Sequence, residues 1–291
     1  MTVGSQIIVI GCSGAVGSRL IPILHAQGSR VLGIRLYGKC LNQNHICTSV
    51  NLLDPLESIR FENFQPKVLI LTSWITTPTI FWESKANEDW VEASKRIVLG
   101  FLNLGGEYIV ATGTCAEYDW NLNRPLEEID KPNPATLYGR SKLKLLNWLA
   151  GLGVPYLWTR TFAQFGLNEP NGRLVPSVID ALLNDRIVTI TNPHGVRDFI
   201  FIEDVVRILS ILVMNKHLGI VNLGTGIGTE IGDLALRLGT MIGKPNLINI
   251  TQDSIDGNMV VADSKKLKGI LGPHSLTSLD SALLRSIEAR S

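Results

Sequence analysis

The sequence lacks long apolar runs and lacks an excess of charge of one sign. No stretch approaches the roughly 18 uninterrupted apolar residues of a membrane span, and no basic region precedes the first apolar run. The 27 Lys and Arg residues nearly balance the 26 Asp and Glu residues, which argues against a nucleic-acid-binding surface. We therefore expect a cytoplasmic protein without a membrane or nucleic-acid partner.

The signatures of metal sites and hydrolases are also missing. The four cysteines form no C-x-x-C pair and are too few for a disulfide framework. The five histidines are scattered without ligand spacing, so no metal is expected. A Gly-x-Ser-x-Gly elbow is absent, which leaves hydrolase chemistry without support.

What the chain does contain is an alternation of short apolar runs with helical patterns. Its 291 residues, 45% of them hydrophobic, are enough for a large core in one domain or two. The pattern predicts helices over residues 87–103 and 138–149, and strands over 6–10, 30–34, 47–50, 67–72, 107–112 and 154–161. Strands separated by helices predict an α/β fold with a Rossmann-like, doubly wound parallel sheet.

A glycine-rich turn follows the first predicted strand and precedes a helical pattern. Strand, glycine turn and helix form the arrangement that binds phosphate at a helix N-terminus. In that arrangement Gly11 allows the tight turn, Gly14 lets the backbone approach a pyrophosphate, and Gly17 permits close packing of helix on strand. The turn therefore predicts a dinucleotide site made by Gly11, Ser13, Gly14, Ala15, Val16 and Gly17.

The residue that follows the second predicted strand bears on the choice of nicotinamide cofactor. An acid at this position accepts from the 2′-hydroxyl of NAD, whereas this chain has Arg35. A guanidinium suits the additional phosphate of NADP through charge-assisted hydrogen bonds. We expect NADP(H) as the cofactor, with NAD(H) as the alternative. An Arg35 side chain that only faces solvent is the alternative to a phosphate contact.

Other strand ends supply further candidate contacts. Asn51 and Leu52 follow the third strand, where an adenine edge is met, although a turn-forming Asn explains the pattern as well. Leu71, Thr72 and Ser73 end the fourth strand at the edge of the expected crevice. Trp74 comes next and either walls the substrate pocket or covers the strand end.

A phenol and an amine stand four residues apart where a helix should begin. Tyr138 and Lys142 then share one helical face, and a nearby ammonium makes a phenolate less costly. Such a phenol can exchange a proton with an alcohol or a ketone. Thr114 lies after the fifth strand, beside the same crevice, and brings a hydroxyl to the pair.

With these motifs on one chain, the sequence resembles the extended branch of the short-chain dehydrogenase/reductase superfamily, which includes NAD(P)-dependent sugar epimerases, dehydratases and reductases. The resemblance covers nearly the whole chain. It rests on the glycine motif, on Thr114 four residues before Tyr118, and on Tyr138-x-x-x-Lys142. Three later segments add to it: Arg160-Thr161-Phe162 with Gly166, Val196 to Asp204, and Val221 to Gly224.

The resemblance implies a catalytic triad of Thr114, Tyr138 and Lys142. In that triad Tyr138 is the acid or base at the sugar, Lys142 lowers the pKa of the phenol and holds the nicotinamide ribose, and Thr114 binds the reacting oxygen. The resemblance also implies that Thr161 contacts the cofactor, that Arg197 meets a diphosphate of the substrate, and that Arg173 is a further substrate contact. A surface pairing of Arg197 with Asp198 or Glu203 is the alternative.

The same resemblance implies two domains and a small-molecule sugar as the partner. A Rossmann domain is expected over residues 1–164 and a smaller substrate-binding lobe over 165–291, with some chain returning to the first. Members of the superfamily often form homodimers through two helices, here the predicted helices 87–103 and 138–149.

The departures from the family pattern bear on the reaction. Sugar dehydratases carry Asp-Glu after the hydroxyl residue, whereas this chain has Cys115 and Ala116, which cannot assist the loss of water. Glu117 comes one position later. We therefore expect an NADP(H)-dependent reductase of a keto group on a sugar, most plausibly a nucleotide-linked 4-keto-6-deoxy sugar. An NAD(P)-dependent nucleotide-sugar epimerase is the first alternative, and a non-catalytic NADP-binding regulator is the second.

Overall fold

The computed structural model of the protein describes residues 5–36, 46–55, 64–167, 169, 171–251, 257–272 and 276–290. The chain forms two compact units. The first comprises Met1–Glu117, Pro134–Arg160 and Val206–Val221, and the second comprises Tyr118–Asn133, Thr161–Val205 and Asn222–Ser291. Within the described ranges, every helix is too short or too polar to cross a bilayer.

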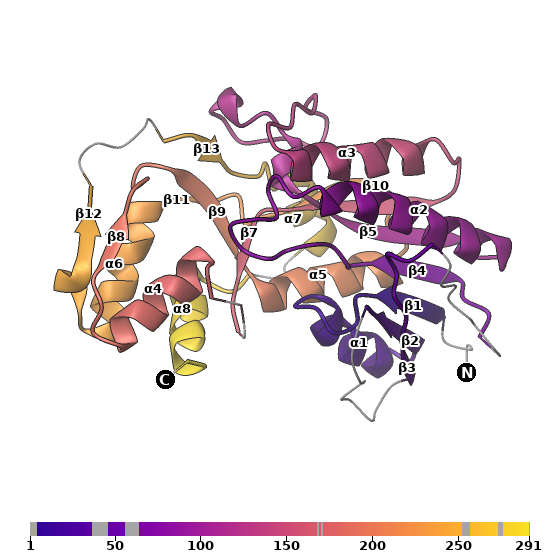
Figure 1. The fold of residues 1–291 in the computed structure, drawn as a ribbon, viewed down its shortest axis with the longest axis horizontal. Coiled ribbons are helices and arrows are strands. Elements are labelled where there is room, and N and C mark those ends of the chain that lie inside the picture. The colour runs from indigo at the N-terminus through magenta and orange to yellow at the C-terminus, as the bar shows by residue number, and fades with distance from the viewer. Residues whose placement is uncertain are drawn as a thin grey trace. The chain divides into compact units, whose positions relative to one another are not determined.

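A seven-stranded sheet organises the first unit (Figure 1). Its strand order is β10-β6-β5-β4-β1-β2-β3, and the neighbouring pairs from β5 to β3 are parallel. The strands are β1 (Gln6–Ile10), β2 (Arg30–Arg35), β3 (Ile46–Ser49), β4 (Val68–Leu71), β5 (Tyr108–Thr114), β6 (Tyr156–Thr161) and β10 (Gly219–Leu223).

Helices cover both faces of this sheet. Figure 1 shows α2 (Ala86–Asn103) and α3 (Leu137–Ala150) on one face, and α1 (Gly17–Ala26) and α5 (Ile202–Met214) on the other. Trp90 and Phe101 of α2 and Leu146 of α3 join one buried cluster with Ile8 of β1 and Leu69 of β4. Because central parallel strands are covered on both sides, they are apolar along their length, which explains the near-continuous apolar runs in the sequence. The predicted doubly wound α/β fold is confirmed.

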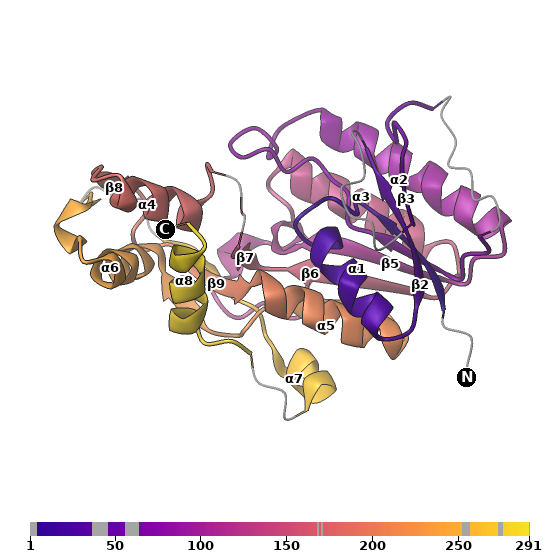
Figure 2. The same cartoon turned by 90° about the horizontal axis from the view of Figure 1, so that it is seen from below.

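The second unit is built around β9 (Val196–Phe201). This strand pairs with β7 (Ala163–Phe165) and β13 (Met259–Val260) in parallel and with β11 (Gly228–Glu230) in antiparallel fashion, while β8 (Val188–Ile190) pairs with β12 (Ile248–Ile250). Three amphipathic helices, α4 (Leu174–Leu183), α6 (Ile231–Ile242) and α8 (Leu279–Glu288), enclose an apolar core with Phe165, Phe199 and Leu238 (Figure 2). The second unit also contains the short helix α7 (Lys265–Leu271) and a 3-10 turn, η3 (Pro245–Leu247).

Several element boundaries differ from the sequence-based prediction. The fifth strand continues to Thr114 instead of ending at residue 112. The turn begins directly after it, where the Thr114 amide donates to Glu117 Oε1 at 2.9 Å. Short 3-10 turns follow at Cys115–Glu117 (η1) and Trp120–Leu122 (η2). Arg35 is the last residue of β2, and β6 begins at Tyr156, two residues later than predicted.

Candidate active site

The order of the sheet reverses at β1, which has β4 on one side and β2 on the other. In open α/β sheets, ligands bind beyond the carboxyl ends of the strands where the order reverses. The glycine turn after β1, the segment after β4 and Arg35 at the end of β2 therefore lie at one edge of the sheet.

The glycine turn is tight at both of its ends. Gly11 has a φ of +91°, and a Cβ there would lie 2.8 Å from the Thr72 Oγ1 and Ser73 Oγ atoms. A Cβ on Gly17 would lie 2.2 Å from the Gly11 carbonyl oxygen, so only glycine lets α1 start this close to β1. Between them, Ser13, Gly14 and Ala15 are exposed at the start of α1. This cradle fits an anionic ligand at the helix N-terminus.

The neighbouring strand ends hold this turn in place. The Thr72 hydroxyl donates to the Ile10 carbonyl at 2.8 Å, and the Gly11 amide donates to the Ile34 carbonyl at 2.7 Å. Leu71 is buried, and Ser73 is half-buried after it. The turn is thus fixed to both strands that flank β1.

The candidate adenosine contacts lie at the ends of β2 and β3. Arg35 is half-buried, and so is Val16 at the start of α1. Asn51 Oδ1 accepts from the Leu53 amide at 3.3 Å, a local contact typical of a turn-forming Asn. Leu52 is buried in the cluster beneath α2 and offers its carbonyl to Arg96 at 3.0 Å.

The start of α3 is fixed by partners for its first amides. Thr136 caps the helix, because its hydroxyl accepts from the Gly139 amide at 3.1 Å. The Tyr138 amide donates to the Trp82 carbonyl at 2.9 Å, and the Leu137 amide donates to Glu83 Oε1 at 3.2 Å. The helix therefore begins one residue before Tyr138, which places this phenol in the first turn.

The Tyr138 ring is half-buried in an aromatic setting. The ring of Phe81 packs edge-on with centroids 5.1 Å apart, and the ring of Trp82 does the same at 5.8 Å. These residues belong to the segment between β4 and α2. Sequence reasoning singled out neither of them.

Lys142 is buried one helical turn after Tyr138, with 4% of its surface exposed. Its amine donates to the Thr112 carbonyl at 2.7 Å and lies 3.8 Å from the centroid of the Trp74 ring. Burial lowers the pKa of Lys142 to about 7, and the charge of Glu117 opposes that shift. The amine is therefore poised to change protonation near neutral pH.

Trp74 is held from behind by α2. Its Nε1 atom donates to Asn87 Oδ1 at 2.7 Å, and its ring stacks on that of Trp90 with the ring centroids 6.3 Å apart. Asn87 is fully buried and donates in turn to the Phe81 and Ser84 carbonyls. The ring orientation that faces Lys142 is thus fixed by a buried polar network.

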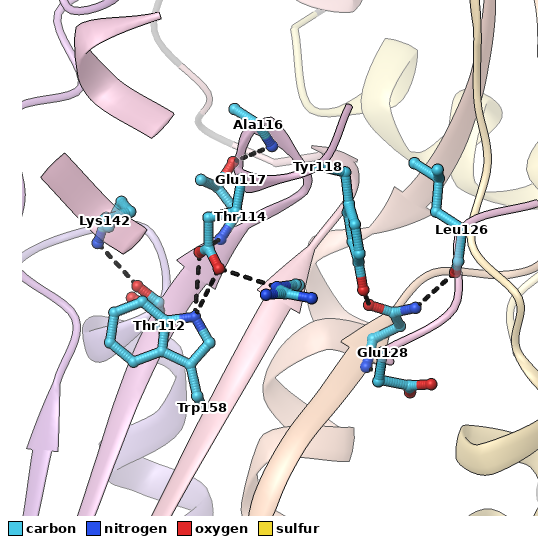
Figure 3. Close-up of polar contacts among 11 residues, drawn as sticks. Thr112, Thr114, Ala116, Glu117, Tyr118, Leu126, Glu128, Lys142 and Trp158 are labelled. Carbon is cyan, nitrogen blue, oxygen red and sulfur yellow. Dashed lines mark hydrogen bonds and ion pairs between the residues drawn. The ribbon is translucent and has the colours of Figure 1, made fainter. Parts of the chain in front are cut away.

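Thr114 lies at the end of β5 in a closed turn (Figure 3). Its Oγ1 accepts from the Ala116 amide at 3.2 Å, which leaves the hydroxyl proton for another acceptor. The turn packs directly on the first turn of α3, since a Cβ on Gly139 would lie 2.2 Å from the Ala116 carbonyl oxygen. The structure therefore brings the Thr114 turn against the helix start that carries Tyr138.

Glu117 is the main feature of the site that sequence reasoning missed. Its carboxylate is fully buried and accepts from Arg160 Nε at 2.8 Å, from Trp158 Nε1 at 3.0 Å and from the Thr114 amide at 2.9 Å (Figure 3). A usable signal was present, because Arg160 lies in the same predicted strand as Leu157 and Trp158, and a buried cation requires a partner. The sequence does not show which of its acids is that partner.

The remaining candidate residues belong to the second unit. Arg197 on β9 donates to the Val196 and Asn258 carbonyls and to Asn258 Oδ1, each at 2.9 Å. Its guanidinium also lies 5.4 Å from the Trp120 ring centroid. Arg173 precedes α4, with its Nε atom 3.6 Å from Glu169 Oε1. Thr161, at the end of β6, is half-buried.

The chain belongs to the NAD dependent epimerase/dehydratase family, whose model matches residues 7–224. The resemblance to the extended short-chain dehydrogenase/reductases is thereby confirmed. A UDP-glucose 4-epimerase of Rhizobium meliloti (strain 1021) is 28% identical to the chain in an alignment of 310 positions, which covers 92% of each protein.

Solved structures share the fold over almost the whole chain. A UDP-N-acetylglucosamine 4-epimerase from Methanobrevibacter ruminantium, in complex with UDP-N-acetylmuramic acid, has a TM-score of 0.84 at 20% identity, covering 99% of this chain and 98% of that one. The UDP-glucose 4-epimerase of Thermus thermophilus, in complex with NAD, has a TM-score of 0.80 at 18% identity over 98% of each chain. An NAD-dependent NDP-hexosamine 5,6-dehydratase has a TM-score of 0.85 at 18% identity, covering 98% and 97%. The shared fold therefore accompanies more than one reaction.

Proposed function

We propose that this member of the family is an NAD(P)-dependent epimerase of a nucleotide-linked sugar. The protein would oxidise a sugar hydroxyl to a ketone and then reduce the ketone from its opposite face. The similarity to curated UDP-glucose 4-epimerases supports this reaction over the net reduction that the sequence favoured. The homodimer and the cytoplasmic location stay predictions.

The residues in the turn after β5 are the main support for this proposal. Thr114 is followed by Cys115 and Ala116, neither of which transfers a proton to a leaving hydroxyl at useful strength. Glu117 is fully buried and paired with Arg160, so it does not replace the missing acid. A site with a hydroxyl, a phenol and an amine supports oxidation and reduction at one carbon, and it does not support elimination of water.

Each residue of the proposed triad has a distinct task. Tyr138 takes the proton of the sugar hydroxyl as the ketone forms and returns it to the same oxygen as the ketone is reduced. The Lys142 ammonium stabilises the phenolate from one helical turn away. Thr114 donates its free hydroxyl proton to the reacting oxygen. A nicotinamide cofactor held at the glycine turn would supply the hydride acceptor and donor for this chemistry.

The cofactor is proposed to sit across the glycine turn with its pyrophosphate at the start of α1. The exposed backbone of Ser13, Gly14 and Ala15 supports this placement. Arg35 at the end of β2 supports NADP(H), whereas the NAD named for several structures of the same fold supports NAD(H). A tightly retained oxidised cofactor is the form that an epimerase needs.

Arg35 also favours a second candidate function, reduction of a nucleotide-linked keto sugar with exchangeable NADPH. One experiment separates the two functions. The purified protein is denatured and the released nicotinamide identified, and the emptied protein is titrated with NADPH and NADH. Retained oxidised cofactor supports the epimerase. An empty protein that prefers NADPH would contradict the epimerase and support the reductase.

A further inference from the structure

Glu117 is a buried acid with four contacts to three residues on two strands, β5 and β6. Its two carboxylate oxygens lie 3.0 and 3.2 Å from Trp158 Nε1, and Oε2 accepts from Arg160 Nε at 2.8 Å. Oε1 also accepts from the Thr114 amide at 2.9 Å. The carboxylate therefore ties β6 to the turn that carries the Thr114 hydroxyl (Figure 3).

Gly113, on the strand before Thr114, leaves the space that the Glu117 carboxylate occupies. A Cβ on Gly113 would lie 2.0 Å from Trp158 Nε1 and 2.5 Å from Glu117 Oε1. The glycine thus lets both side chains reach the backbone of β5 just before Thr114. Close packing of this kind holds the carboxylate in one position.

The Glu117 carboxylate interacts with two buried basic side chains instead of one. Arg160 on β6 and Lys142 on α3 are both buried, with 1% and 4% of their surfaces exposed. The Lys142 amine donates to the Thr112 carbonyl at 2.7 Å, and Glu117 Oε1 accepts from the Thr114 amide two residues along the same strand. Both groups thus lie at the end of β5, and the Glu117 charge raises the pKa of the amine against the lowering effect of burial. Burial raises the pKa of Glu117 itself, and the Arg160 charge opposes this. Tyr138 is the other titratable group on this face of α3, and the Trp74 ring covers the amine from the β4 side.

We propose that Glu117 is a positioning residue, whose carboxylate fixes the Thr114 turn and supplies a negative charge that favours the ammonium form of Lys142. The expected effect of Glu117 on turnover rests on the proposed function, whereas its effects on Lys142 and on the Thr114 turn do not. Arg160 compensates the buried carboxylate and holds it toward β5. The acid therefore acts through Lys142 and Thr114, and no contact with the sugar is required of it.

The test is a titration of Lys142 in the full-length protein. The protein is labelled with ε-¹³C lysine, and the Lys142 signal is assigned by its loss in Lys142→Met. In Glu117→Gln, we expect the midpoint of the Lys142 titration to fall by about one to two pH units, because the opposite charge has been removed. An unchanged midpoint in a folded Glu117→Gln protein would overturn the proposal.

Two control variants separate charge from structure. Trp158→Phe removes one donor to Glu117 but leaves the carboxylate, so the Lys142 midpoint should stay within a few tenths of a unit even if stability falls. Asp198→Asn removes another buried carboxylate, which accepts from Thr225, Gly226 and Ala262 in the second unit. A shift as large in either control as in Glu117→Gln would overturn the assignment to the Glu117 charge.

Glu117→Gln leaves Arg160 buried without its acid, so it is accompanied by the double variant Glu117→Gln/Arg160→Met. The double variant lacks both charges, and loss of the Arg160 cation opposes loss of the acid, so its Lys142 midpoint should lie between those of Glu117→Gln and the original protein. A midpoint in the double variant below that of Glu117→Gln would contradict the proposal.

The titration needs no substrate, so it tests Glu117 even if the protein turns over no nucleotide sugar. Where turnover is measurable, Glu117→Gln should also move the alkaline limb of the kcat profile to lower pH while KM changes little. A profile that keeps its shape with a uniformly lower kcat would show a purely structural role and overturn the proposal.

Discussion

The Lys142 amine lies 3.8 Å from the centroid of the Trp74 ring, and the same amine donates to the Thr112 carbonyl at 2.7 Å. An ammonium over an aromatic face is stabilised by the ring quadrupole, most strongly where water is excluded. Trp74 thus has a role beyond covering a strand end or walling a pocket. It helps a buried amine to hold its charge.

Replacing Trp74 should make Lys142 easier to deprotonate. A cation–π contact is worth about 0.5–2 kcal/mol, so in Trp74→Leu the Lys142 titration midpoint should fall by roughly 0.4–1.5 units. Trp74→Phe keeps an aromatic face but loses the bond to Asn87, and it should shift the midpoint less. Equal shifts in both variants, read from the ε-¹³C lysine signal, would show that the π face is not responsible.

The buried amine also predicts a pH dependence of stability. The pKa of Lys142 falls from 10.5 to about 7 on folding, so between these values the unfolded chain binds more protons than the folded protein. The free energy of unfolding should therefore rise with pH through this window, by up to roughly 4–5 kcal/mol from this group. The cost of burying the charge is fully present below about pH 7.

Lys142→Met checks this dependence, because the thioether carries no charge. Urea denaturation from pH 6 to pH 10 should give the variant a flatter profile than the original protein, with its largest relative gain at the acid end. Parallel profiles for the two proteins would exclude Lys142 as the source of the slope.

Gly113 should tolerate no side chain. A Cβ would meet Trp158 Nε1 at 2.0 Å, so Gly113→Ala should destabilise the fold by about 3 kcal/mol or more. Gly100 in α2 is a matched control, because a Cβ there has nothing within 4 Å. Gly100→Ala should raise stability by about 0.5–1 kcal/mol through helix propensity. Thermal unfolding of both variants measures the contrast, and equal effects would contradict the close packing around Glu117.

The phenol of Tyr138 should be needed for turnover and not for folding. Tyr138→Phe should lower kcat by about 10²- to 10⁴-fold, the usual contribution of a positioned acid or base. Its ring contacts with Phe81 and Trp82 do not use the hydroxyl, so its thermal unfolding should change little. Tyr156→Phe on β6 is the control and should keep its turnover. If Tyr138→Phe retained full activity, the proposed acid–base role would be wrong.

Local patterns carried most of the fold prediction. The apolar run before Gly11 predicts β1 with the bounds that the structure shows, because strand, turn and helix lie next to one another in sequence. The Tyr138 and Lys142 spacing likewise predicts a shared helix, since four residues span one helical turn.

The parts that sequence reasoning missed depend on contacts between distant residues. Glu117 and Arg160 pair across 43 positions, and the sequence does not show which acid pairs with the buried Arg160. Trp74 reads as core by its type, and only the structure places it against Lys142. The end of β5 was misplaced by two residues because the carboxylate that receives the Thr114 amide comes from the following turn.

The most direct measurement of the central claim is ¹H NMR of UDP-glucose and UDP-N-acetylglucosamine incubated with the purified protein and no added cofactor. The proposed epimerase should accumulate the 4-epimer of one of these sugars without net release of reduced nicotinamide, and Tyr138→Phe should lose that activity. Failure to form an epimer, together with NADPH-dependent reduction of a nucleotide-linked 4-keto sugar, would contradict the proposed epimerase function.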